Sequence, residues 1–166
     1  MANFKLPYFN TIDSAALEEY YDIEIDFSGN SIQIDLNFGT KTIEVKKLET
    51  VKNFIENIRI HDLNNKKLIA KDYADKDADT VKFYLAHHLE ELSEDDLANL
   101  IDINSKSDEH EKLLLKKLHL VRVGIFPEGE TQFATFDYSI GQDLTNYLVV
   151  IDTDENGNLV YMTMES

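Results

Sequence analysis

The densest group of potential metal ligands in the sequence is one short acidic segment. Asp152, Asp154 and Asn156 stand at the first, third and fifth ligand positions of a calcium-binding EF-hand loop, and Gly157 permits its sharp turn. The twelfth position is Thr163, where such a loop needs a bidentate glutamate, and the flanking residues alternate as strands do. We therefore favour a tight β-hairpin whose Asp and Asn side chains stabilise the turn, and we expect no metal and no cofactor.

Two adjacent histidines stand in a segment with helical periodicity. His87 and Glu91 would share a helix face, but a metal site needs three or more converging ligands and this helix offers two. His88 falls within the apolar stripe, so we interpret it as a hydrogen-bonded core or interface histidine. The chain has no Cys and no Gly-x-Ser-x-Gly motif, so nucleophilic catalysis has no support. The sequence names no catalytic residue and leans away from an enzyme.

Carboxylates alternate with apolar residues in two successive strand-like segments near the start of the chain. The outward-facing carboxylates of this predicted hairpin are Asp22, Glu24, Asp26 and Asp35. A two-residue loop at Gly29-Asn30 would place Glu24 opposite Asp35. Because like charges directly opposed in a sheet are unfavourable, this face is either a solvated surface or a docking site for the Lys and Arg side chains of a partner.

A second candidate site is a polar centre in the C-terminal strands. The predicted strand pairing places Arg122 diagonal to Asp137, and we expect a semi-buried ion pair between them. We group His88 with this pair as the candidate polar centre. The rest of this sheet face is expected to be apolar and therefore covered, either by a two-fold partner or by the N-terminal segment. The aromatic and aliphatic side chains of that segment are Phe4, Leu6, Tyr8 and Phe9.

Hydrophobic periodicity predicts the elements that position these residues. Period-two alternation marks a hairpin over 21–38 and four strands over 121–125, 133–138, 147–153 and 159–164. Between them, helical spacing predicts a helix over 43–60, another over 79–92, and short helices beginning at Ser93 and Ser107. A further short helix capped by Asp13 precedes the hairpin.

This order of elements predicts the α+β class. Strands at both ends with helices between favour an antiparallel sheet, built from the N-terminal hairpin and the C-terminal four-stranded meander, with the central block of helices packed on one side. No repeat or linker divides the chain, so residues 1–166 are expected to form a single domain.

Charge limits the classes of partner. The 166 residues include 32 acidic and 16 basic side chains, for a formal net charge of −16. Such a surface repels phosphates and anionic lipids, so we expect no nucleic-acid partner and no membrane partner, whereas a basic protein is compatible. The absence of Cys, of an apolar leader and of a membrane-spanning segment predicts a cytoplasmic protein.

Four segments together resemble an uncharacterised bacterial family that is catalogued as a domain of unknown function (DUF2004-like). They are Leu6-Pro7-Tyr8-Phe9, the residues 34–38, the residues 136–141 and the C-terminal residues 153–166. The resemblance covers nearly the whole chain and implies a bacterial cytoplasmic origin, with no catalytic residue to carry over. Small acidic proteins of this style also recur among the immunity proteins of contact-dependent toxin systems.

The sequence thus leaves three functions open. The first is a non-enzymatic, acidic protein-binding module of the immunity or regulatory type. The second is a small-molecule-binding protein or enzyme with a pocket between the sheet and the helices, which would need a converging His, Arg and carboxylates. The third is a structural homo-oligomer, such as a homodimer.

Overall fold

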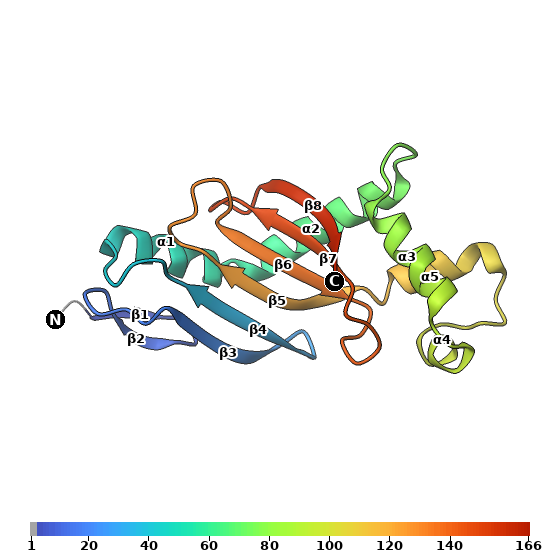
Figure 1. Cartoon of the computed structure of the whole chain (residues 1–166), viewed down its shortest axis with the longest axis horizontal. Helices are drawn as coiled ribbons and strands as arrows, with labels where there is room; N and C mark the ends of the chain where they lie inside the picture. Colours follow the sequence, from blue (N-terminus) through green and yellow to red (C-terminus); the bar gives the residue numbers. More distant parts are fainter. Residues whose placement is uncertain (1–2) are drawn as a thin grey trace.

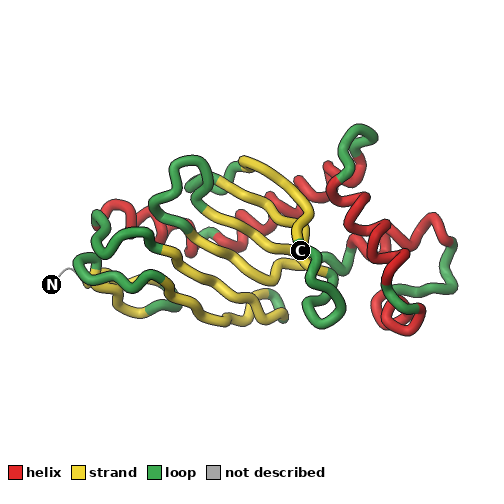
Figure 2. The backbone as a smooth tube through the Cα atoms, in the orientation of Figure 1, coloured by secondary structure: helices red, strands yellow, loops and turns green. Residues whose placement is uncertain are grey.

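The computed structural model describes residues 3–166 and shows a six-stranded sheet with helices behind it and beside it (Figure 1, Figure 2). This main sheet has the strand order β3-β4-β5-β6-β7-β8. Its strands are β3 (Tyr20–Phe27), β4 (Asn30–Asn37), β5 (His119–Ile125), β6 (Ala134–Ser139), β7 (Leu148–Thr153) and β8 (Leu159–Glu165). The predicted α+β class, with a hairpin and a four-stranded meander in one sheet, is confirmed.

The hairpin β3-β4 forms in a register that differs by two residues from the predicted one. Ser28 (φ 52°) and Gly29 (φ 88°) make the loop, and both take the left-handed conformation that a two-residue hairpin turn requires. Glu24 consequently faces Gln33, and not Asp35. Because the shift is an even number of residues, every side chain keeps its predicted face.

The hairpin joins the meander through a parallel pair, β4 with β5, while the other ladders of the main sheet are antiparallel as predicted. Gln33 lies beside Arg122 and Ile34 beside Val123. In the sequence, the whole helical block connects β4 to β5. A connection of that length can return the chain to the end of the sheet where β4 begins, so that the two strands run in parallel. The antiparallel expectation is therefore wrong at this one ladder.

The helices are α1 (Val45–Glu56), α2 (Ile58–Ala74), α3 (Thr80–Glu91), α4 (Glu94–Leu100) and α5 (His110–Leu115), with a 3₁₀ turn over Ser107–Glu109. Helices α1 and α2 lie behind the main sheet, and α3, α4 and α5 gather beyond one end of it (Figure 1). The helix predicted over 43–60 is divided at Asn57. Ser93 caps α4 as predicted, because its Oγ accepts the Asp96 N–H at 3.1 Å.

The hydrophobic core fills the space between α1, α2 and the sheet. Phe54 of α1 packs edge-on against Phe133, with ring centroids 5.1 Å apart, and lies 5.9 Å from Phe136 of β6. His61 of α2 stacks on the same Phe54 ring at 4.5 Å. These large rings bury much apolar surface where they interdigitate, and this burial holds α1 and α2 to the sheet.

The N-terminal segment does not cover the other face of the main sheet. It forms its own two-stranded hairpin, β1 (Asn3–Leu6) and β2 (Asn10–Asp13), which contacts α1. Leu6 and Ile12 are buried in the core, whereas Tyr8 (φ 67°) is 50% exposed at the turn. The predicted helix after Asp13 is absent, since this residue ends β2 and its Oδ1 accepts the Ala15 N–H at 3.0 Å.

A β-bulge changes which side chains that face carries. The register of β5 shifts between Leu120 and Arg122, so Leu120 pairs with Tyr138 on the helix side while Arg122 points to the opposite side. Phe133, just before β6, also turns into the core, where it packs against Phe54. The second face therefore carries fewer large apolar side chains than expected, and α1 and α2 lie on the other side of the sheet (Figure 1).

Candidate functional site

All seven carboxylates carried by the strands of the main sheet lie on one face, the side opposite α1 and α2. We call this side the open face. Directly paired residues share a face of a sheet, and the ladder registers connect these positions from β3 to β8. The seven residues are Asp22, Glu24, Asp26, Asp35, Asp137, Asp152 and Glu165. The opposite side of the strands is apolar and faces the core.

Arg122 is the single Lys or Arg in these six strands, and it lies in the middle of the open face. Its Nε and Nη2 donate to the two carboxylate oxygens of Asp35 at 2.7 and 2.9 Å, and its Nη1 donates to Asp137 Oδ2 at 3.3 Å. The predicted pair of Arg122 with Asp137 is thus present. The hydrogen bonds that Arg122 donates to Asp35 raise the pKa of the guanidinium, so Arg122 stays charged.

Asp35 was assigned wrongly to the exposed acidic face. Its side chain is fully buried beneath Arg122, and it also accepts a hydrogen bond from Asn37 Nδ2 at 2.7 Å. Gly124 makes room for this arrangement, since a Cβ at that position would lie 2.6 Å from Arg122 Nη2. Sequence reasoning missed the pair because it depends on the parallel ladder between β4 and β5. The signal that the sequence offered was Gly124, a glycine two residues after Arg122 that leaves room for its side chain.

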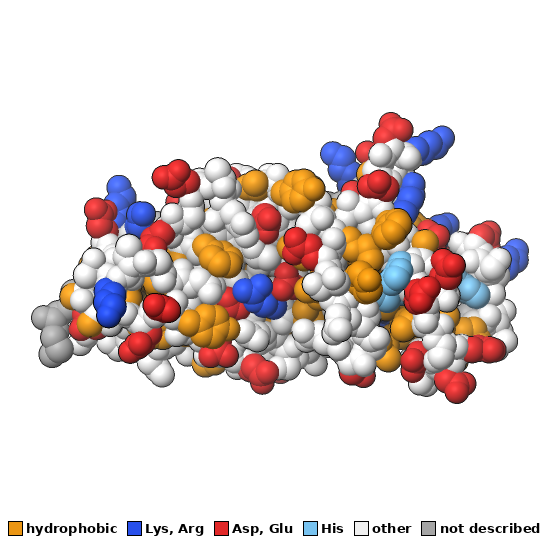
Figure 3. All heavy atoms as spheres, in the orientation of Figure 1, with side chains coloured by type: hydrophobic (Ala, Val, Ile, Leu, Met, Phe, Trp, Pro, Cys, Tyr) orange, Lys and Arg blue, Asp and Glu red, His pale blue; other side chains and the backbone are white. Residues whose placement is uncertain are grey.

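The exposed part of the open face is strongly acidic. Asp22, Glu24 and Asp26 are exposed along β3, as predicted, and Glu165 is exposed on β8. Figure 3 looks onto this face and shows a basic group near its middle with acidic groups around it. Because Arg122 is already shared between two carboxylates, it does not neutralise the acidic residues of the edges.

His88 does not join Arg122 and Asp137, which corrects the predicted polar centre. It is a buried core histidine of α3, the role that the apolar stripe indicated. Its Nδ1–H donates to the Tyr84 carbonyl at 2.7 Å, and its Nε2 accepts the Thr145 hydroxyl at 2.8 Å. The histidine therefore holds the loop before β7 to α3 and takes no part in the open face.

A pH dependence of stability follows from two buried histidines. Burial lowers the pKa of His61 and of His88 in the folded chain. Below about pH 6.5 the unfolded chain binds more protons at these positions than the folded chain does, so the free energy of unfolding should fall as the pH falls. Urea unfolding at several pH values across this range measures how steeply the free energy of unfolding changes with pH. A His88→Gln variant should show a shallower slope, and a slope unchanged from wild type would contradict the assignment.

The acidic segment that resembles an EF-hand forms the predicted hairpin turn between β7 and β8. Gly157 alone takes a left-handed conformation there, with φ 81°, in a loop one residue longer than a two-residue turn. The Asp154 carboxylate accepts the backbone N–H groups of Asn156 and Asn158, both at 2.9 Å. Although partial burial acts in the opposite direction, these hydrogen bonds lower the pKa of Asp154. The carboxylate is thus used to hold the turn.

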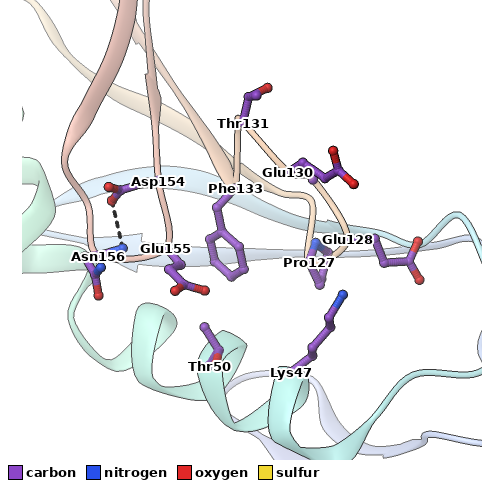
Figure 4. Close-up of a pocket in the computed structure, with 11 residues that line it drawn as sticks. Lys47, Thr50, Pro127, Glu128, Glu130, Thr131, Phe133, Asp154, Glu155 and Asn156 are labelled. Carbon is purple, nitrogen blue, oxygen red and sulfur yellow. Dashed lines mark hydrogen bonds between the residues drawn. The ribbon is translucent and has the colours of Figure 1, made fainter.

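Away from the open face, polar side chains line two clefts. His87 and Glu91 line one of about 440 Å³, together with the loop before β7. Among residues 3–166, however, no three His, Asp or Glu side chains are placed to hold a metal ion. The second cleft, of about 350 Å³, lies between α1 and the turns at the ends of β5 and β7 (Figure 4).

The cleft in Figure 4 is the nearest counterpart of the predicted pocket between sheet and helices. Lys47 and Thr50 of α1 line one side of it, and Glu130 and Glu155 belong to the turns on the other side. Glu128 lines it as well, but its carboxylate already accepts the Gly39 N–H at 2.8 Å. The cleft lacks the converging His, Arg and carboxylates that would favour a small-molecule-binding protein or enzyme, because its only basic lining residue is Lys47.

Comparison with known proteins returns no family model that matches the chain, and neither a curated protein nor a solved structure matches it. The resemblance to the DUF2004-like family therefore stays a prediction. Over residues 3–166, none of the helices has both the length and the apolar character needed to cross a membrane.

Proposed function

We propose that this chain is a non-enzymatic, acidic protein-binding module whose open face docks a basic protein. The observation that carries the proposal is the segregation of charge. Seven carboxylates and a single arginine lie on the face of the main sheet opposite α1 and α2, and five of these carboxylates are not paired with the arginine. An immunity or regulatory protein of the bacterial cytoplasm would act in this way, by occupying a basic surface of its partner.

The geometry of Arg122 supports a protein-binding role over a catalytic one. This guanidinium directs three of its five N–H groups to Asp35 and Asp137, so most of its donors hold strands together instead of facing a substrate. Its hydrogen bonds fix β4, β5 and β6 to one another. The site is therefore a rigid platform with an acidic surround, which suits steering and docking of a positively charged partner.

Two exposed tyrosines add contact area to the same face. Tyr20 on β3 is 49% exposed and Tyr161 on β8 is 60% exposed, and both share the face of the carboxylates. Tyrosine combines a large apolar ring with a hydroxyl and is enriched at protein interfaces. The partner is thus expected to contact an acidic platform with an aromatic side chain near each edge.

Charge reversal tests the proposal. Asp22→Lys with Glu24→Lys should weaken binding of the purified basic partner at least about tenfold, and binding by wild type should weaken as salt is raised. Both positions are exposed, so the melting temperature should change little. Asp35 is left intact because it is buried. Isothermal titration of the partner captured from the source cells measures the affinity.

The matched control is Glu90→Lys with Glu91→Lys, which makes the same change in net charge on exposed positions of α3. Equal loss of affinity in both double variants would mean that only net charge matters and that the open face is not the docking site. Unchanged affinity in the Asp22 and Glu24 variant would place the interface elsewhere.

A further inference from the structure

The outer edge of β3 is an unpaired strand edge. β3 is the first strand of the main sheet and pairs with β4 along all eight of its residues, while β1 and β2 pair only with each other. Its outward backbone N–H and C=O groups therefore have no strand partner within residues 3–166. A free edge of this length is a template for one more strand.

The two faces of β3 differ in polarity along this edge. Asp22, Glu24 and Asp26 are exposed on the open face, at every second position. On the helix side, Tyr21, Ile23 and Ile25 are only half-buried although they pack against the core. A strand beside them would meet carboxylates with one row of its side chains and apolar surface with the other.

We propose that an extended basic segment of the partner adds to β3 as a seventh strand of the sheet. In this segment Lys or Arg alternates with apolar residues, so that the cations lie beside Asp22, Glu24 and Asp26 while the apolar row covers Ile23 and Ile25. Alternate side chains on one side of a strand repeat about every 6.4–6.8 Å, and the same repeat holds in the added strand. This inference rests on the proposed function and identifies how the partner is held.

The expected footprint ends before the turn. Arg59 of α2 lies over the Phe27 ring at 5.2 Å and donates to Ser28 Oγ at 3.1 Å. That end of β3 already has a basic side chain against it. The added strand is therefore expected to match the residues from Tyr21 to Asp26.

Charge selects the basic segment over a second copy of this chain. Pairing of two β3 edges would set carboxylates of one copy beside carboxylates of the other, which is destabilising in a sheet. Each copy also brings a formal net charge of −16. Alternating carboxylates thus protect the edge from self-pairing and leave it complementary to a cationic strand.

A synthetic peptide tests the inference. The probe is a blocked seven-residue peptide that alternates Lys with Val. The control probe is the same peptide N-methylated at every residue, which keeps the charges but removes the backbone N–H donors from both edges of the strand. Titration into isotopically labelled protein should produce saturable amide shifts centred on residues 20–27. The N-methylated peptide should bind at least about tenfold more weakly, as expected from the loss of several backbone hydrogen bonds.

Two protein variants locate the edge. Glu24→Lys, in the middle of β3, should weaken binding of the unmodified peptide at least about tenfold, whereas Glu165→Lys, on the opposite edge strand and the same face, should change it little. We expect both variants to fold because their positions are exposed, and circular dichroism checks this.

Three outcomes would overturn strand addition. Equal binding of the two peptides would show that charge alone attracts them, in which case docking on the open face survives while the seventh strand does not. Shifts centred on β8 would assign the other edge. Self-association of the free protein that Glu24→Lys abolishes would identify a second copy as the occupant. Failure of the proposed function is a separate result, in which charge reversal leaves binding of the native partner unchanged.

Discussion

Arg122→Met is expected to destabilise the protein by about 2–4 kcal/mol, because it leaves the carboxylate of Asp35 buried without its bidentate partner. The side chain of Asp35 is 0% exposed and that of Arg122 is 32% exposed, so the expected loss is somewhat smaller than for a fully enclosed pair. Asn37 still donates to Asp35 at 2.7 Å and softens the effect. Urea unfolding near pH 7 measures the change in the free energy of unfolding.

Two further variants separate the buried pair from a general charge effect. Lys112→Met removes a solvent-exposed ion pair with Glu109 and should cost less than about 1 kcal/mol. Combining Arg122→Met with Asp35→Leu should recover most of the loss, since no uncompensated carboxylate then remains at that position. An Arg122→Met variant as stable as Lys112→Met would show that the neighbouring amides suffice for Asp35.

Gly157→Ala is expected to lower the free energy of unfolding by about 2–4 kcal/mol, through two effects at one position. The backbone there has φ 81°, which strains any residue with a Cβ. In addition, a Cβ would overlap the imidazole of His61. That ring cannot retreat easily, because it stacks on Phe54 at 4.5 Å. Thermal or urea unfolding of the variant measures the loss.

Gly29→Ala provides the matched control for the backbone strain. Gly29 has a similar φ of 88°, but a Cβ there would meet no atom within 4 Å. This variant should lose only about 1–2 kcal/mol, the strain of a left-handed residue. Equal losses in the two variants would mean that His61 yields to the new methyl group, and that the contact between the β7-β8 turn and α2 is loose.

Local patterns in the sequence were sufficient for the elements and their faces. Alternation of Asp22, Glu24 and Asp26 with apolar residues determined which side of β3 meets solvent, and an even register shift left that assignment intact. The apolar stripe around His88 predicted its burial, and Ser93 predicted the start of α4. These features depend on neighbours within a few residues, so periodicity and capping chemistry report them directly.

Contacts between residues that are distant in the chain could not be predicted from such local patterns. Asp35 and Arg122 are 87 residues apart and meet only because β4 and β5 pair in parallel across the helical block. A one-residue bulge between Leu120 and Arg122 then decided which side chains of β5 face the core. Periodicity specifies which face a residue takes within its own strand, but it carries no information about which strand becomes the neighbour. The sequence by itself therefore determined an acidic, alternating edge strand, whereas the tertiary structure decided that Asp35 belongs to a buried ion pair and that the face around it is open.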